Sequence, residues 1–444
     1  MLFQNLTEIS QVELMKLTEK NNHLVPTPPK TEWFANATWI FATGLLMMIG
    51  GSVGTAVFFG AAAIVLFNVS FLGKPFIFPR EARFAVTVSL FLFLTKVPSA
   101  IFFENQIEAL KILGSNLQLI TIALLICGLL QTPKIDYMRL YLRAFSIGLP
   151  IAFITGIVQR TMLKPLRLEG AMGNTLVYVS LTLVAGFLVT ISVKKETGIW
   201  RVIAIFGVLS AFAITAMSLR RTALLVLLTL LLPAIWYIAR TLKPKAIHWI
   251  GLVGSASILS ALGLWAVSFY GSFVQNRLSG SIDRINANGL TLEGLVDQNR
   301  LVLYRYGTEF FKEHPFTGIG LQNNLNAVIQ KAQIVDGITL RSFTHLHSEY
   351  LNQAVGTGVL GLVAVILFLA IPIWIALGST KNANYLDRVM FGFYLSGGFA
   401  LLALTNLVTN HDLMLNFFCL GIIVLVVSNY QANNDVNLLM KYPE

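Results

Sequence analysis

The sequence predicts an all-α polytopic membrane protein, and three observations support this fold class. Of the 444 residues, 55% are hydrophobic and only 12% are charged, and the mean hydropathy is +0.71. Apolar runs of about 20 residues recur along the chain, which is the length that a helix needs to cross a hydrocarbon core of roughly 30 Å. The runs are continuous rather than alternating, so they predict helices and not the strands of a barrel.

About twelve apolar runs can be placed, with one long polar segment between the ninth and the tenth. We expect spans near residues 33–51, 54–72, 84–103, 114–131, 144–158, 171–193, 200–217, 221–239, 247–270, 355–377, 389–407 and 412–430, the fifth being short. The chain then divides into a cytoplasmic segment at 1–32, nine spans in 33–270, an outside loop at 271–354, three spans in 355–430 and a cytoplasmic tail at 431–444.

The basic residues give the orientation, because loops rich in Lys and Arg stay in the cytoplasm. An even number of spans puts both ends of the chain on one side, together with most of the basic loops. These loops carry Lys74, Arg80 and Arg83; Lys134, Arg139 and Arg143; Lys194, Lys195 and Arg201; Arg240, Lys243 and Lys245; and Lys381 and Arg388. That side is predicted to be cytoplasmic, so the long loop faces outward.

Two short outside loops break this rule because each carries several basic residues. The first, between spans five and six, contains Arg160, Lys164 and Arg167; the second, a tight turn between spans seven and eight, contains Arg220 and Arg221. A cation within the membrane costs roughly 2.5–3.5 kcal/mol on insertion scales, so each needs a partner. Either these side chains snorkel to lipid headgroups, or they form an anion site at the outer membrane face.

The long outside loop is predicted to be a helical cap on the bundle, because about 85 residues are few for an independent enzyme domain. Residues 297–314 have the spacing of an amphipathic helix, with Leu303, Tyr306 and Phe310 on one face and Asp297 as a candidate N-cap. The loop carries as many acidic as basic residues, which excludes a polycation for nucleic acid.

Two arginines of this predicted helix differ in register. Arg300 lies near its N-terminus, where its charge adds to the helix dipole in attracting an anion, whereas Arg305 should point in another direction. The helix is expected to end at Pro315 and a glycine-rich turn. We interpret Gly318 and Gly320 in this turn as structural rather than phosphate-binding.

The candidate chemistry lies where the long loop re-enters the membrane, at His345, His347, Glu349 and Tyr350. A metal site is one interpretation, but on a helix only His345 and Glu349 share a face, and cysteine ligands are absent on this side. A hydrogen-bonding structural histidine is the second. The third, which we favour, is acid–base chemistry, because an imidazole with a pKa of about 6.5 can take a proton from a hydroxyl group.

The arginines predicted on the same side of the membrane suit a departing diphosphate, since cations stabilise the charge that develops on such a leaving group. They offer a substitute for a divalent metal, so no cofactor is expected. A base and a cation cluster at a lipid interface together predict group transfer from a lipid diphosphate.

Five short motifs follow one another in the order found in a known family. They are Ser218-x-x-Arg221, Asp297-x-x-Arg300, Pro315-x-x-Gly-x-Gly320, His345-x-His347-Ser-Glu-Tyr-Leu351 and Gly356-x-Gly358-x-x-Gly361. With the twelve-span layout and the long outside loop, they make most of the chain resemble the bacterial O-antigen ligase family, part of a wider ligase and polymerase superfamily. Each motif is weak alone, and their order and position make the set specific.

The resemblance implies a metal-independent, inverting glycosyltransferase at the periplasmic face of the bacterial inner membrane. Its donor would be a polysaccharide on undecaprenyl diphosphate, and its acceptor the lipid A-core oligosaccharide. It further implies that His347 activates the acceptor hydroxyl and that Arg221 and Arg300 hold the diphosphate. The family more often has a small hydroxyl residue where this chain has Arg220, so the turn offers two arginines for this role.

Other residues match the family less closely. Arg160 and Arg167 correspond only through an Arg-x-x-Gly pattern, as further donor-binding candidates, while His345, Glu349, Tyr350 and Arg305 are candidates for acceptor binding or support.

Three alternatives remain open at the level of the sequence. An O-antigen polymerase and a protein O-oligosaccharyltransferase share the donor chemistry and differ in the acceptor; the short predicted tail at 431–444 favours a ligase over the latter. A lipid-diphosphate transporter would place ionisable residues along a pathway through the membrane. Lys96, next to a predicted kink at Pro98, is the exception to otherwise uncharged span interiors, so transport is disfavoured.

Overall fold

The computed structural model describes residues 30–74, 76–102, 106–131, 135–162, 170–218, 220–242, 286–287, 298–338, 343 and 345–441. Within these residues the secondary structure is helical, without strands. The helices are α2 (Lys30–Ile49), α3 (Ser52–Phe71), α4 (Arg80–Phe102), α5 (Gln106–Gly114), α6 (Gln118–Leu130), α7 (Tyr137–Met162), η1 (Gly170–Met172), α8 (Thr175–Lys195), α9 (Gly198–Ser218), α10 (Arg221–Leu242), α14 (Gln298–Glu313), α15 (Asn324–Asp336), α16 (Glu349–Leu377), α17 (Tyr385–Ala403) and α18 (Asp412–Lys441).

By length and composition, 10 stretches of helix among the described residues are suited to cross a membrane, with α5 and α6 together forming one of them. A shorter apolar stretch, Asn36–Ile49, lies in α2. The prediction of an all-α polytopic membrane protein is therefore confirmed. Every predicted span coincides with a helix except the ninth, at 247–270, which lies outside the described residues.

Two predicted boundaries were wrong. The fifth span was expected to be short, at 144–158, but α7 runs from Tyr137 to Met162. Its first turns carry Arg139 and Arg143, whose charges lower the local hydropathy although both pair with a carboxylate. The tenth span was expected from residue 355, but α16 begins at Glu349, because the Ser348 side chain caps it and a buried network accommodates the Glu349 charge.

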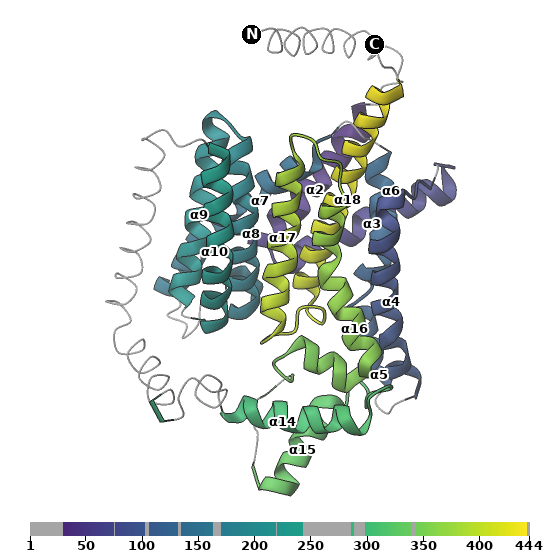
Figure 1. Ribbon diagram of the computed structural model, residues 1–444, viewed down its shortest axis with the longest axis vertical. Helices are drawn as coiled ribbons and strands as arrows, with labels where there is room; N and C mark the ends of the chain where they lie inside the picture. The colour runs from purple at the N-terminus through teal and green to yellow at the C-terminus, as the bar shows by residue number, and fades with distance from the viewer. Residues whose placement is uncertain are drawn as a thin grey trace, which may run out of the picture.

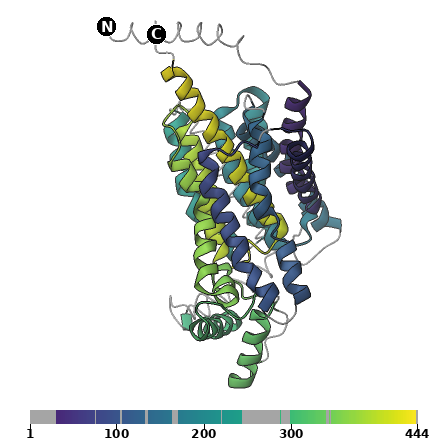
Figure 2. The same cartoon turned by 90° about the vertical axis from the view of Figure 1, so that its right-hand side faces the viewer.

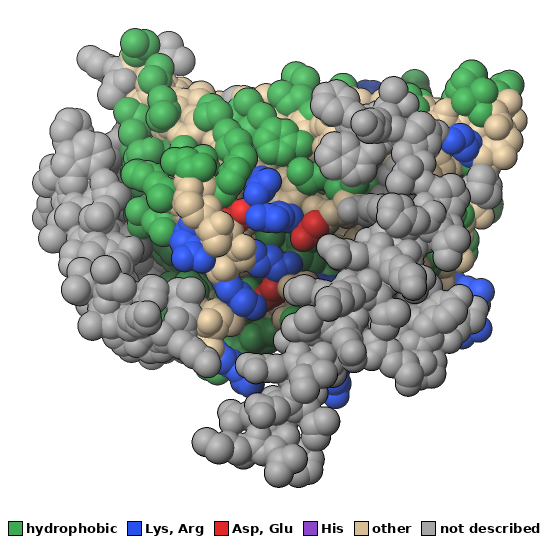
Figure 3. All heavy atoms as spheres, turned by 90° about the horizontal axis from the view of Figure 1, so that it is seen from above, with side chains coloured by type: hydrophobic (Ala, Val, Ile, Leu, Met, Phe, Trp, Pro, Cys, Tyr) green, Lys and Arg blue, Asp and Glu red, His purple; other side chains and the backbone are tan. Residues whose placement is uncertain are grey.

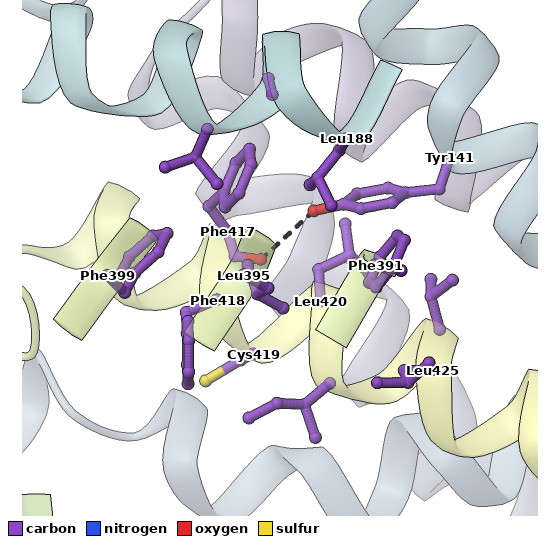
Figure 4. Packing of buried hydrophobic residues seen from close by; sticks show 14 of the residues in the cluster. Tyr141, Leu188, Phe391, Leu395, Phe399, Phe417, Phe418, Cys419, Leu420 and Leu425 are labelled. Carbon is purple, nitrogen blue, oxygen red and sulfur yellow. Dashed lines mark hydrogen bonds between the residues drawn. The ribbon is translucent and has the colours of Figure 1, made fainter. Parts of the chain in front are cut away.

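The helices pack side by side in one bundle (Figures 1 and 2). The most buried spans are α8, which packs against α7, α9, α10 and α17, and α18, which packs against α3, α6, α7, α16 and α17. Figure 4 shows the centre of this core, where Tyr141 of α7, Leu188 of α8, Phe391 of α17 and Phe417 of α18 meet. The Tyr141 hydroxyl donates to the Phe417 carbonyl oxygen at 3.3 Å, so the buried phenol has a partner.

The described part of the long loop contains two helices, as predicted, and these helices, α14 and α15, lie at the end of the bundle where α16 begins (Figures 1 and 2). The predicted apolar face of α14 is buried: Leu303 and Tyr306 join a small core with Val328 of α15 and Leu346, and Phe310 packs partly buried against it. This cap therefore has an apolar core of its own. Burial of the apolar stripe in that core stabilises the amphipathic helix α14.

The cap is joined to α16 through the glycine-rich turn. Gly358 in α16 is non-helical, with φ 71° and ψ −163°, which frees backbone groups on both sides of the break. The freed Val355 carbonyl accepts from Ile319 N at 2.9 Å, and Val359 N donates to the Pro315 carbonyl at 2.7 Å. Broken helices at membrane depth persist only where neighbouring protein satisfies such groups, and here the turn does so.

This contact requires glycine on both sides. A Cβ atom on Gly318 would lie 2.5 Å from the backbone carbon of Gly356, and one on Gly358 would lie 2.3 Å from the Phe316 carbonyl oxygen. Both distances are shorter than real Cβ contacts. The structure therefore gives Gly318 the packing role that the sequence predicted.

The opposite end of the bundle is basic. Figure 3 shows Lys and Arg side chains gathered there among apolar ones, with a few carboxylates between them. Glu196, after α8, binds the Arg139 and Arg143 guanidinium groups at 2.8 and 2.7 Å. Asp387 of α17 binds Lys194 at 2.6 Å and accepts from the Tyr237 hydroxyl at 2.7 Å.

Candidate functional site

His347 lies just before the Ser348 cap of α16 and has an unusual backbone conformation. Its φ of 54° is the only positive value for a residue other than glycine among those described. Such conformations persist where surrounding contacts enforce them, and they cluster at functional sites. Here the Tyr304 hydroxyl of α14 donates to the His347 carbonyl at 3.0 Å. The His347 ring packs against the rings of Phe343 and His345, with centroid distances of 5.2 and 4.3 Å.

The His347 ring is neutral at physiological pH. Burial, together with the charges of His345 and Arg300, lowers its pKa to about 3, although a backbone hydrogen bond with Thr405 opposes the shift. Burial also lowers the pKa of His345, against the attraction of Glu349. A neutral imidazole keeps one nitrogen free to accept a proton.

The free nitrogen of His347 can be identified. Its Nδ1 atom is buried and makes no hydrogen bond with the described part of the chain. Because the bond with Thr405 raises the pKa, it is a bond in which the ring donates to the Thr405 carbonyl, and Nδ1 has no such partner. The arrangement sets the tautomer, with the proton on Nε2 and the lone pair on Nδ1.

Arg300 lies in the first turn of α14 and is half-buried. Its charge lowers the pKa of both His345 and His347, so the cap brings Arg300 and the two histidines together. Arg300 forms no ion pair with a described carboxylate. Its charge, placed beside neutral imidazoles, leaves a site that would attract an anion.

Arg305, by contrast, is turned away from the histidines. It is exposed and pairs with Glu309 at 3.5 Å and with Asp336 of α15 at 3.4 Å. This agrees with the predicted difference in register between Arg300 and Arg305. Arg305 therefore belongs to the surface of the cap.

A loop between α17 and α18, residues 404–411 (the α17–α18 loop), connects the histidine to the tight turn before α10. Thr405 makes the backbone hydrogen bond with the His347 ring, and its hydroxyl donates to the Thr222 hydroxyl in the first turn of α10 at 2.8 Å. The neighbouring Arg221 begins α10, and Arg220 is half-buried before it. Thus the turn predicted to bind an anion lies on the same side of the bundle as His347.

The loop's role was missed by sequence reasoning, which placed Thr405 inside a span at 389–407. Its polar character was a usable signal, because two Thr-Asn pairs, Thr405-Asn406 and Thr409-Asn410, stand between two apolar runs. Such a polar stretch predicts a short loop at the end of the helical bundle, where its side chains can form hydrogen bonds with site residues.

The Glu349 and Tyr350 side chains form hydrogen bonds with other parts of the bundle. Glu349 is fully buried and accepts hydrogen bonds from the backbone N–H groups of Val408 at 2.8 Å and Thr409 at 3.2 Å. The Tyr350 hydroxyl donates to the Ala400 carbonyl of α17 at 3.0 Å. Both side chains therefore tie the start of α16 to α17 and the loop that follows it.

The first of the two basic loops, between α7 and α8, is described only at its edges. Arg167 lies outside the described residues, and the same holds for Lys164 and for the side chains of Arg160 and Arg221. At the edge, the Gly170 N–H donates to the Gln159 side chain at 2.8 Å. Within the described residues no group of three or more His, Cys, Asp or Glu side chains is placed to hold a metal ion.

Comparison with known protein families gives a match over part of the chain. Residues 205–366 match a family described as O-antigen ligase, and a search of curated proteins found no match. The matched segment contains the tight turn with Arg220 and Arg221, the cap with Arg300, and His347. The resemblance drawn from the motifs is thereby confirmed over this part of the chain.

Proposed function

We propose that this protein belongs to the O-antigen ligase and polymerase superfamily, whose enzymes are glycosyltransferase-like, and that it is a ligase. In this proposal it transfers a polysaccharide from undecaprenyl diphosphate to the lipid A-core oligosaccharide, at the periplasmic face of the bacterial inner membrane and without a metal ion. The observation that carries the proposal is the neutral His347 ring, whose Nδ1 makes no hydrogen bond within the described residues, beside Arg300, which pairs with no described carboxylate.

Donor binding would begin with the cations. The diphosphate binds Arg300 together with Arg221 or Arg220 of the tight turn, with Arg160 and Arg167 as further donor-binding candidates. Opposite unit charges 4 Å apart attract by about 4 kcal/mol at an effective dielectric of 20, before desolvation is subtracted. The bound anion also cancels part of the positive field on His347 and so raises the pKa of its ring.

Transfer then needs one base and one leaving group. The acceptor hydroxyl gives its proton to Nδ1 of His347 while its oxygen attacks the anomeric carbon from the face opposite the diphosphate. The bond from that carbon to the diphosphate oxygen breaks, and the electron pair leaves with undecaprenyl diphosphate, whose charge the arginines hold. The anomeric configuration is inverted, and the imidazolium afterwards releases its proton to the product diphosphate or to water.

The acceptor decides between ligase and polymerase, so the test varies the acceptor alone. Purified protein is given lipid-linked polysaccharide with either lipid A-core or a second polysaccharide chain, and the products are separated by size. We expect transfer to lipid A-core. Extension of the polysaccharide without transfer to lipid A-core would make the protein a polymerase, and transfer to a protein acceptor would make it an oligosaccharyltransferase.

A further inference from the structure

A lysine in the interior of α4 is fully buried and fully engaged. The Lys96 Nζ atom donates to Asn116 Oδ1 at 2.7 Å, to Thr409 Oγ1 at 3.2 Å and to Asn410 Oδ1 at 3.0 Å. Asn116 lies between α5 and α6, whereas the other two partners belong to the α17–α18 loop. Lys96 therefore holds this loop against the bundle and does not mark an open transport pathway.

Glu349 meets the same loop from the other side. One of its oxygens, Oε2, accepts from the N–H groups of Val408 and Thr409, and the other, Oε1, accepts from Gln353 Nε2 at 2.7 Å and from the Thr409 hydroxyl. Lys96 and Glu349 attract each other but make no direct ion pair, because the Thr409 hydroxyl stands between them.

The Thr409 hydroxyl makes three of the hydrogen bonds in this network. Its oxygen accepts from Lys96 Nζ and from Gln353 Nε2, and its one proton goes to Glu349. A hydroxyl has one donor and two acceptor sites, so all three are used. The pattern is complete only when the lysine is protonated and the glutamate is ionised, since each charge then has its complement.

The network is connected to His347 by two routes. Along the chain, Glu349 stands two residues after His347, on the far side of the Ser348 cap. Across space, the loop that the network holds at residues 408–410 also contains Thr405, which binds the His347 ring and the Thr222 hydroxyl. Displacement of this loop would move the group that sets the His347 tautomer.

We propose that Lys96 and Glu349 are positioning residues for His347, holding the α17–α18 loop so that Thr405 keeps the imidazole in its reactive orientation. The inference rests on the proposed function, since it needs a reaction in which His347 acts. Burying two charges does not by itself favour stability, and well-packed apolar residues often replace such pairs without loss. What the charged pair supplies is one defined arrangement of a polar loop beside the site.

The test uses three variants of the full-length protein: Lys96→Met, Glu349→Gln and the two combined. Each single variant should lower kcat about tenfold to a hundredfold, because small displacements of a reacting group have effects of this size. The KM for the lipid-linked donor should change less than about threefold, since the arginines are untouched. The combined variant should regain part of the lost kcat, because it leaves no buried charge without its complement.

A matched control separates positioning from general destabilisation. Asn416→Ala removes a partly buried hydrogen bond of 2.7 Å between Asn416 of α18 and Thr55 of α3, and it changes no residue of the α17–α18 loop. If it lowers the melting temperature as much as the network variants do and lowers kcat equally, the positioning role is refuted. The role is also refuted if either single variant keeps the wild-type kcat, or if the double variant regains none of it.

The assay distinguishes this failure from failure of the proposed function. Wild-type protein and His347→Ala are measured beside the network variants. Absence of transfer by the wild type with every acceptor, or unchanged transfer by His347→Ala, removes the glycosyl-transfer reaction and the positioning role with it. If transfer is lost in His347→Ala but is unchanged in the Lys96 and Glu349 variants, only the positioning role is refuted.

Discussion

The two ends of the bundle both combine buried carboxylates with basic residues, but they balance charge differently. At the end opposite the cap, Glu196 contacts the two guanidinium groups of Arg139 and Arg143 directly. At the cap end, Glu349 is separated from Lys96 by a hydroxyl, and Arg300 has no described carboxylate partner. In the first arrangement the carboxylate pairs directly with the basic side chains, whereas the second leaves the positive charge of Arg300 beside two neutral histidines.

The difference shows in the groups that titrate. Arg139 and Arg143 hold the pKa of Glu196 at about 2, so that carboxylate is ionised and satisfied. At the cap end, burial with the charges of His345 and Arg300 holds the pKa of His347 at about 3, so that ring is neutral, and its Nδ1 makes no hydrogen bond within the described part of the chain. Saturated charge is typical of a structural cluster, while unsatisfied polar atoms are typical of a site that awaits a ligand.

The largest expected effect comes from removing the base. His347→Ala should lower the transfer rate about 10²- to 10⁴-fold, the usual contribution of a general base, while expression and membrane insertion stay normal. The measurement is the formation of polysaccharide linked to lipid A-core by purified protein. His314→Ala is the matched control, because His314 is an exposed histidine of the same cap. Near-normal transfer by His347→Ala would remove the histidine from the mechanism.

The next effect tests Arg300, which has no carboxylate partner among the described residues. Arg300→Ala should lower kcat/KM for the lipid-linked donor about a hundredfold, because a charge-assisted contact to a phosphate group is lost. Arg305→Ala changes an arginine of the same helix that already pairs with Glu309 and Asp336, and should leave kcat/KM unchanged. Equal losses in both variants would show that the cap attracts the donor by its overall charge, not through one arginine.

A smaller effect concerns pH. The lowered pKa of His347 means that the ring of the free protein takes a proton only as the pH falls toward about 3, so kcat/KM should not decline through protonation of this ring between pH 7 and pH 5. If the donor binds as proposed, its diphosphate would raise the pKa of the ring, so the acid limb of kcat should lie at higher pH than that of kcat/KM. Coincident acid limbs near pH 6.5 would show that the ring is not buried as described.

The smallest expected effect on activity comes from the opposite end. Glu196→Gln should leave kcat unchanged but lower the free energy of unfolding by about 1–3 kcal/mol at pH 7, since it strips two arginines of a largely buried partner. A lowered carboxylate pKa contributes stability above its ordinary value of about 4.5, and that contribution is lost as the pH falls toward 2. Thermal unfolding of both proteins should therefore converge in acid; a constant difference would contradict the assignment.

The sequence by itself determined the fold class and most spans, because apolar length is what lipid demands of a helix. It also indicated His347 and Arg300, since both lie in motifs of one polar loop, and it separated Arg300 from Arg305 by helical register. The boundaries predicted for the fifth and tenth spans were wrong, because charged residues lie inside these two helices. A hydropathy scale penalises every charged residue in a span, even one whose charge has a partner. Arg139, Arg143 and Glu349 all have partners from other elements.

Only the tertiary structure decided how the site is held together. Lys96 and Thr409 are 313 residues apart in the chain, and Thr222 and Thr405 are 183 apart, so no local pattern relates either pair. The break at Gly358 likewise depends on a distant turn that supplies the backbone hydrogen bonds the helix gives up. Such contacts depend on which helix faces are brought together by packing, and this is a property of the whole bundle.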